Sequence, residues 1–157
     1  MKKAVTGGQE VIDNINRAIK GIEGRTQKGL IRAAIMVMKS MEKVAPVIPV
    51  DTGNLRASRF LVTKKGAGAG VRGGRFKDVS MKPQHEAIIS KYTTEAKAVQ
   101  EPLVILGFSA NYASYVHENL EATFKRPNAG AKFLQAAMVR ERHNMLRMIQ
   151  KEARIKK

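Results

Sequence analysis

Residues 49–58, with the sequence PVDTGNLRAS, separate a long helical pattern from the first strand-like pattern of this 157-residue chain. Two prolines end the helical pattern, because proline lacks the amide proton that a helix interior requires. Gly53 provides the backbone freedom for a tight turn. The side chain of Asp51 or Thr52 is predicted to cap a short helical turn over residues 55–58. The stretch therefore predicts a sharp change of direction between a helix and a sheet.

The segment before this turn, residues 9–45, has one amphipathic helical pattern in two halves that stay in phase. Gly21, Gly24 and Gly29 interrupt it, and each costs up to about 1 kcal/mol in a helix interior. The pattern predicts either one long bent helix or two helices with a short break around Gly24. The apolar stripe consists of Val11, Ile12, Ile15, Ile19 and Ile22, followed by Ile31, Ala34, Ile35, Met38 and Ala45.

The segments after the turn favour a small antiparallel sheet. Residues 59–64 alternate between apolar and polar side chains, and residues 86–93 are predicted as a second strand through Ile88, Ile89 and Tyr92. Between them lies a basic, glycine-rich segment, residues 65–82, so the two strands are expected to form an extended β-hairpin with a long loop. Residues 103–108 predict a third, short and buried strand.

Helices are predicted for the rest of the chain. Asn111 can cap a helix over residues 112–120, and the last helix is expected at residues 130–154, with Arg140 among its outward-facing basic residues. This order of elements predicts an α+β fold with the helices on one face of the sheet. The length suits a single domain, residues 1–157, with a flexible N-terminus at 1–8 and a basic tail at 155–157.

The charge is the strongest compositional feature. With 29 lysines and arginines against 13 acidic residues, the net charge is +16, which predicts an acidic partner such as nucleic acid, a membrane surface or an acidic protein. Solvated surface charge is the alternative for each basic segment. The candidate residues that face DNA or a neighbouring protein are Lys64, Lys65, Arg72, Arg75, Lys77, Arg147, Lys151 and Arg154.

The sequence offers no catalytic, cofactor or metal site. The chain has no cysteine, and the zinc-protease motif fails because Glu121, not histidine, follows His117 at the fourth position. There is no nucleophile elbow of the Gly-x-Ser-x-Gly type, and no tight carboxylate cluster. A hydrolase would have to depend on His117 or Glu118. No segment approaches the roughly 18 consecutive apolar residues that span a bilayer. The apolar face of the last helix has methionine and alanine in place of tryptophan or phenylalanine anchors, so a membrane surface is not expected as a partner either.

Several motifs together resemble a family of tailed-bacteriophage proteins described as minor tail, tail-completion, neck or head–tail joining proteins. Residues 49–58 are similar to its Pro-Val-Asp-Thr-Gly-x-Leu-x-x-Ser signature. A strand ending at Gly107, a Tyr-Ala-x-Tyr-Val-His-Glu helix and an aromatic-Leu-x-x-Ala step follow in the family's order. Residues 119–123 depart from the Phe-Gly-Thr that the family often has there. The motif residues are Asp51, Thr52, Gly53, Leu55, Gly107, Tyr112, Tyr115, Phe133 and Leu134.

The resemblance implies a virion structural protein, not an enzyme, in the neck or tail of the particle and assembled in the host cytoplasm. Six or twelve copies would form a ring, as a neck, tail-completion or tail-terminator component, around the DNA channel. Its partners would be portal, adaptor or tail-tube proteins, with genomic DNA in the channel as a further candidate. The basic residues would then face DNA phosphates or an acidic adjoining ring. The alternative is a sequence-independent nucleic-acid-binding protein that acts as a monomer or dimer.

Overall fold

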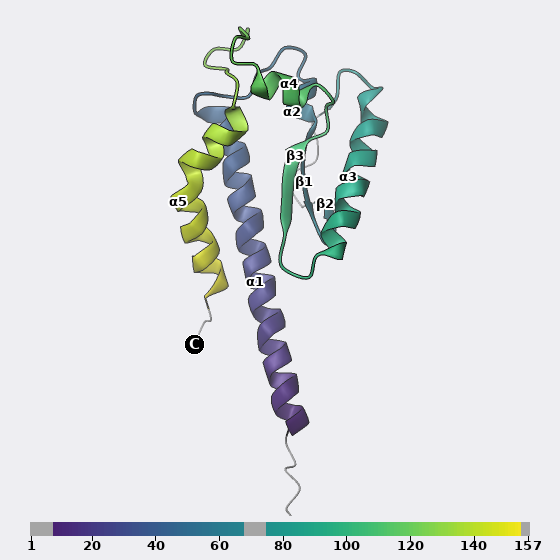
Figure 1. Ribbon diagram of the computed structural model, residues 1–157, viewed down its shortest axis with the longest axis vertical. Helices are drawn as coiled ribbons and strands as arrows, with labels where there is room; N and C mark the ends of the chain where they lie inside the picture. The colour runs from purple at the N-terminus through teal and green to yellow at the C-terminus, as the bar shows by residue number, and fades with distance from the viewer. Residues whose placement is uncertain (1–7, 68–74, 155–157) are drawn as a thin grey trace, which may run out of the picture.

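The computed structural model describes residues 8–67 and 75–154 and has an α+β architecture, as predicted (Figure 1). A helix of 36 residues, α1, runs the length of the molecule, which corresponds to about 54 Å. The elements in order are α1 (Gly8–Lys43), α2 (Asn54–Ala57), β1 (Arg59–Thr63), β2 (Gly66–Ala67), α3 (Met81–Ala98), β3 (Val104–Phe108), α4 (Ala113–Glu118) and α5 (Phe133–Ala153).

The sheet is antiparallel with the strand order β2–β1–β3 and lies between two helical layers. On one face, Leu61 joins the core formed with α1, α4 and α5. On the other face, Phe60 and Val62 pack against α3. Helix α5 lies along α1, and α3 covers the opposite side of the sheet (Figure 1). The helices therefore lie on both faces of the sheet, and not on one face as the sequence predicted, because residues 86–93 form a helix.

The prediction of a strand at residues 86–93 is wrong, because this segment belongs to α3. Its side chains that face the sheet recur at helical spacing, and Ile88, Ile89 and Tyr92 pack against β1 with Ala96 one turn further on. The expected long hairpin is therefore absent from this part of the chain. Instead, a two-residue turn at Lys64 and Lys65 joins β1 to β2, and the predicted loop 65–82 contains β2 and the start of α3. Residues 68–74 of that loop lie outside the described residues.

A glycine in β3 explains how α3 fits the sheet. Gly107 pairs with Phe60 across the strands, and a Cβ atom at Gly107 would lie 2.7 Å from the Phe60 ring. The absence of a side chain at Gly107 leaves room for this ring, which stacks on Tyr92 of α3 with centroids 5.4 Å apart. The motif glycine is therefore a packing requirement of the sheet.

Helix α1 is continuous through its glycines, so the alternative of two helices is not what the chain forms. Its two halves differ in environment. From Ala33 to Met41 the helix contributes buried residues to the core, whereas Val11, Ile12, Ile15, Ile19 and Ile22 are 37–58% exposed. Figure 1 shows this N-terminal half extending beyond α5, the sheet and α3. We call residues 8–24 the arm.

The C-terminal end of α1 is held by two arginines that come from distant parts of the chain. Arg140 of α5 donates from Nη2 to the carbonyls of Ser40 and Val44, both at 3.3 Å, and from Nη1 to that of Ala45 at 3.0 Å. Arg126 donates to the carbonyl of Glu42 at 2.8 Å. The last carbonyls of a helix have no intrahelical partners, and cationic donors there also match the helix dipole. Arg140 is therefore a helix cap, which corrects its predicted outward orientation.

Glu42 completes this junction, because its carboxylate binds three arginines. Arg59 of β1 donates to Oε1 at 2.6 Å, Arg56 lies 3.6 Å from the same oxygen, and Arg126 lies 3.2 Å from Oε2. The Glu42 side chain is only 22% exposed, so these contacts are partly shielded from water. They tie α1 to α2, to β1 and to the segment before α5.

Replacing Gly29 and Gly24 by alanine is expected to change stability in opposite directions. A Cβ atom at Gly29 would lie 3.0 Å from the Cα of Ile149, so alanine would push α5 away and cost about 1–3 kcal/mol. At Gly24 no atom lies within 4 Å of the Cβ position, so alanine should stabilise the helix by about 0.5–1 kcal/mol. Urea unfolding of both variants measures the change in the free energy of unfolding. Equal effects at the two positions would contradict the close approach of α5.

Glu42→Gln is expected to lower the free energy of unfolding by about 2 kcal/mol, since the partly buried Arg59 and Arg126 and the exposed Arg56 lose their common counter-charge. The matched control is Glu118→Gln, because Glu118 is 55% exposed and pairs with Lys132 at the surface, where ion pairs contribute little. Guanidinium unfolding of the two variants makes the comparison. Similar midpoints would show that the junction does not depend on Glu42.

Candidate functional site

The motif segments, which are far apart in the sequence, form one junction at the end of the sheet. The carbonyl of Ser58 accepts a hydrogen bond from the Ser109 amide at 2.9 Å. The ring of Phe133 meets that of Phe108 edge to face at 5.5 Å and that of His117 at 5.0 Å. Leu55, Ala113, Phe133 and Ala137 belong to the same buried cluster. The predicted motif therefore specifies how α2, β3, α4 and α5 meet.

The turn before α2 uses a different capping scheme from the predicted one. Gly53 has a φ angle of 89°, which favours glycine. The buried side chain of Asn54 accepts hydrogen bonds from the amides of Lys77 at 2.8 Å and Asp78 at 3.3 Å, and so fixes the approach to α3. Thr52 accepts from the Asn54 amide at 3.4 Å.

Asp51 is not a cap, because its carboxylate is exposed and pairs with Lys125 at 2.7 Å. The hydrogen bond and charge of Lys125 lower the pKa of Asp51. Asn111 likewise does not cap α4, whose N-cap position is occupied by Tyr112 without a side-chain cap hydrogen bond.

The motif tyrosines lie at the surface of this junction. Tyr112, together with the turn residues Asp51, Thr52 and Gly53, lines a hollow of about 460 Å³. Partial burial raises the pKa of Tyr112. Tyr115 is 70% exposed, whereas Phe133 is fully buried and Leu134 partly so. The two tyrosines are therefore available to a neighbouring molecule, and the other aromatic motif residue serves the core.

The first of two basic grooves lies between α1 and the lower end of the sheet. It has a volume of about 810 Å³, and Lys64 and Lys65 of the β1–β2 turn line it opposite α1. Lys64 also donates to the carbonyl of Gln100. Lys20, Lys28 and Arg32 of α1 line the same groove, with Glu23 as its single acidic residue among those described. We call this the sheet-end groove, and its walls suit a polyanion.

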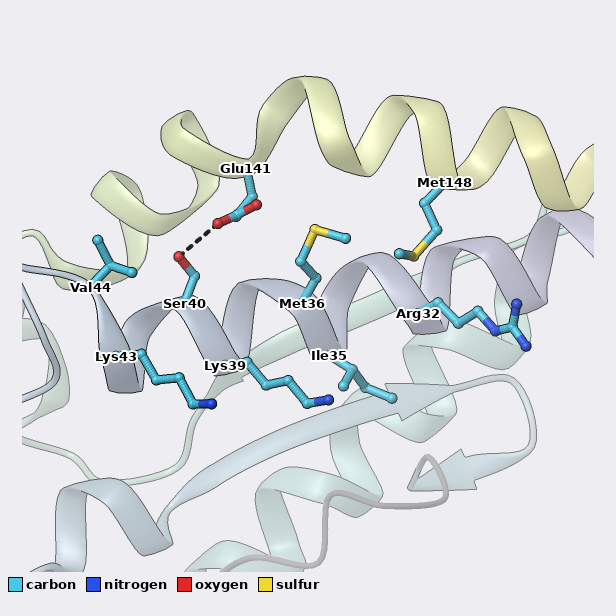
Figure 2. Close-up of a pocket in the computed structure, with 9 residues that line it drawn as sticks. All are labelled: Arg32, Ile35, Met36, Lys39, Ser40, Lys43, Val44, Glu141 and Met148. Carbon is cyan, nitrogen blue, oxygen red and sulfur yellow. Dashed lines mark hydrogen bonds between the residues drawn. The ribbon is translucent and has the colours of Figure 1, made fainter.

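The second groove follows the seam between α1 and α5, and we call it the α1–α5 groove (Figure 2). Its first part has a volume of about 640 Å³, and its second part, of about 370 Å³, shares three lining residues with the first. Figure 2 shows Met36 and Met148 pointing into the space between the helices, and Lys39 and Lys43 along one side. The hydrogen bond from Ser40 to Glu141, at 3.0 Å, crosses the seam. The groove is thus apolar along its floor and basic along its rim.

Seven of the eight predicted basic residues lie among the described residues, in four places. Lys64 and Lys65 line the sheet-end groove, and Arg147 and Lys151 line the α1–α5 groove. Arg75 and Lys77 are exposed beside the motif turn, Arg154 is exposed at the end of α5, and Arg72 lies outside the described residues. Arg32 lines both grooves and joins them, and it also binds Glu152.

The basic residues of α1 were missed by the sequence analysis. Lys20, Lys28 and Arg32 contribute to the sheet-end groove, and Lys39 and Lys43 to the α1–α5 groove. Their signal was a basic face on the helix opposite its apolar stripe. Only the packing of α5 and the sheet on either side of α1 turns that face into the walls of two grooves.

Residues 8–67 and 75–154 contain no group of three histidine or acidic residues arranged to hold a metal ion. His117 lies against Phe133 and its Nδ1 is 2.7 Å from Glu118, whose pKa is lowered mainly by the hydrogen bonds from Lys132 and His117. In the same part of the chain, no helix is long and apolar enough to span a bilayer.

Neither the models of protein families, nor the curated proteins, nor the solved structures compared with this chain gave a match. The function is therefore argued from the motif and from the surfaces of the fold.

Asn54→Ala should lower the free energy of unfolding by about 1–3 kcal/mol, because the amides of Lys77 and Asp78 lose their acceptor in two partly buried hydrogen bonds. Asp51→Ala, three positions earlier, should leave the unfolding midpoint unchanged, since its partner is an exposed lysine. Thermal and denaturant unfolding of both variants measure the difference. A stability loss at Asp51 equal to that at Asn54 would restore Asp51 as the cap.

Proposed function

We propose that this protein is a virion structural component of a tailed bacteriophage, acting at the head–tail junction as a neck, tail-completion or tail-terminator ring. The observation that carries the proposal is the convergence of the motif. Residues 49–58, 104–108, 112–118 and 133–137 resemble consecutive signatures of that family, and the fold gathers them into one junction. Segments that resembled the family signatures by chance would not be expected to lie together in the fold.

The surface supports a role beside a polyanion. The sheet-end groove gathers basic residues from two segments of the chain, namely Lys20, Lys28 and Arg32 of α1 and Lys64 and Lys65 of the β1–β2 turn. Lysines suit contacts to phosphates, which are governed by charge and need no fixed geometry. In the proposed ring, this groove faces the genome, or an acidic surface, in the channel. The α1–α5 groove, with its apolar floor, suits a protein neighbour instead.

The direct experiment removes the gene from the phage that carries it. Loss of the protein should leave DNA-filled heads and finished tails that fail to join, and labelled protein supplied in trans should appear at the junction by electron microscopy. Protein absent from purified particles, or located away from the junction, would contradict the proposal.

A binding experiment tests the charged groove and separates the alternative, a free nucleic-acid-binding protein. Duplex DNA affinity should fall steeply with salt, and replacing Lys28 and Lys65 by glutamine should reduce the log–log salt slope by about 2. The control replaces Lys82 and Lys97, two exposed lysines of α3, and should leave most of the affinity. Tight DNA binding by a protein absent from particles would favour the alternative function. DNA binding that responds equally to both pairs would exclude the sheet-end groove as the contact.

A further inference from the structure

Two surfaces of this fold are exposed and apolar in ways that match each other. One is the arm, where five aliphatic side chains from Val11 to Ile22 remain at least 37% exposed. The other is the α1–α5 groove, where Ile35, Met36, Val44 and Met148 line an open space. Exposed aliphatic stripes of this kind mark contact surfaces in soluble proteins.

The arm has the form of a helix that binds in a groove. Ile12, Ile15, Ile19 and Ile22 follow the alternating spacing of three and four residues that keeps side chains on one face. Recognition of a helix by a groove uses anchors at this spacing. The stripe from Val11 to Ile22 covers about 17 Å of helix at 1.5 Å per residue.

The α1–α5 groove matches that stripe in length and chemistry. Its lining along α1 extends from Arg32 to Val44, which is about 18 Å on the same scale. Two methionines in the floor can adjust to the shape of inserted aliphatic side chains. Pairs of lysines and arginines border the groove, against Glu141 and Glu152 as the acidic lining residues among those described.

Charge identifies the partner as another copy of this chain. The arm carries three acidic residues, Glu10, Asp13 and Glu23, against two basic residues, a net charge of −1 in a chain of +16. Two copies therefore repel over most of their surface, but the arm is the segment that a basic groove accepts. A basic rim around an apolar floor is complementary to an aliphatic stripe on a segment with a net negative charge.

We propose that the arm of one copy lies in the α1–α5 groove of the next copy. The two contact surfaces are different, so the contact is heterologous and repeats from copy to copy, closing into a ring where the rotation allows. The inference deepens the proposed function by naming the contact within the ring, and rests on it only for the ring's closure. The contact itself is measured on the purified chain, whereas the phage assignment is decided on particles, so either can fail without the other.

The test uses two full-length variants whose replaced residues lie on opposite sides of the contact. In the arm variant, Ile15→Gln and Ile19→Gln remove two anchors without changing charge. In the groove variant, Lys39→Glu and Lys43→Glu reverse two exposed rim charges. Wild-type protein should sediment at several times the chain mass of 17.3 kDa, and each variant alone should sediment as a monomer.

An equimolar mixture of the two variants is the decisive sample. The arm variant retains an intact groove and the groove variant retains an intact arm, so the mixture should form a 1:1 dimer that stops at one contact. Arms that bound one another would instead let the groove variant dimerise by itself, since each of its copies has an intact arm. That result, or a monomeric wild-type protein, would overturn the proposal.

The matched control is Asn14→Gln with Gly24→Gln, which alters exposed positions of the arm away from the stripe. It should assemble like the wild type, and loss of assembly here would overturn the assignment of the stripe.

Crosslinking through introduced cysteine pairs gives an independent check, because the natural chain has no cysteine. Mixed Ile15→Cys and Met36→Cys copies should crosslink to each other under oxidation. Crosslinking as strong between Asn14→Cys and Met36→Cys copies would exclude the proposed orientation.

Discussion

The carboxylate of Glu42 at the end of α1 is the interaction on which the rest of the structure depends. It lies where the long helix gives way to the motif turn, and its three arginine partners come from α2, β1 and the segment before α5. Arg126 and Arg140 complete the site at the end of the helix, where they donate to the carbonyls of Ser40, Glu42 and Ala45. Part of the high arginine content is thus used for internal structure.

Because the C-terminal half of α1 is held in the fold, its N-terminal half projects from the fold as the arm. The half of α1 that lies beside the sheet and α5 contributes the buried residues from Ala33 to Met41. At Gly29 a Cβ atom would lie only 3.0 Å from the Cα of Ile149, near the C-terminal end of α5. Beyond that point the helix continues as the arm, with its aliphatic stripe exposed. The same arrangement separates the charges, since the arm is slightly acidic and the α1–α5 groove beside the buried half is basic. A chain with a net charge of +16 therefore retains one segment with which identical copies can associate.

The sequence was sufficient for the elements whose patterns are local. Four elements have the predicted type: α1 with its helical stripe, β1 with its alternation, β3 with its apolar run and α5 with its long amphipathic pattern. The strand prediction for residues 86–93 was wrong because Ile88, Ile89 and Tyr92 are compatible with either a strand or a helix over so short a window. The wider spacing from His85 to Ala96 is helical, and both of these residues are buried. Pro83 in the first turn of α3 is compatible with that helix.

The site was less predictable, because its parts depend on tertiary contacts. No local pattern indicates that Arg140 turns back onto α1, that Asn54 holds the approach to α3, or that Phe60 requires Gly107 opposite it. Asp51 satisfied the preference for an N-cap, yet Gly53 occupies that position and Asp51 pairs with Lys125. The basic residues were identified by composition, but their division between two grooves follows from how α5 and the sheet flank α1.

Hydrogen exchange of the purified chain at low and high concentration tests the central claim most directly, namely that α1 is one helix with a fixed half and a projecting half. Amides of residues 33–43 should be strongly protected at both concentrations, because the junction and α5 cover them. Amides of residues 12–22 should exchange rapidly in dilute, monomeric protein and become protected as copies assemble. Equal protection of the two halves in the dilute protein, or an arm whose exchange does not change with concentration, would contradict the account.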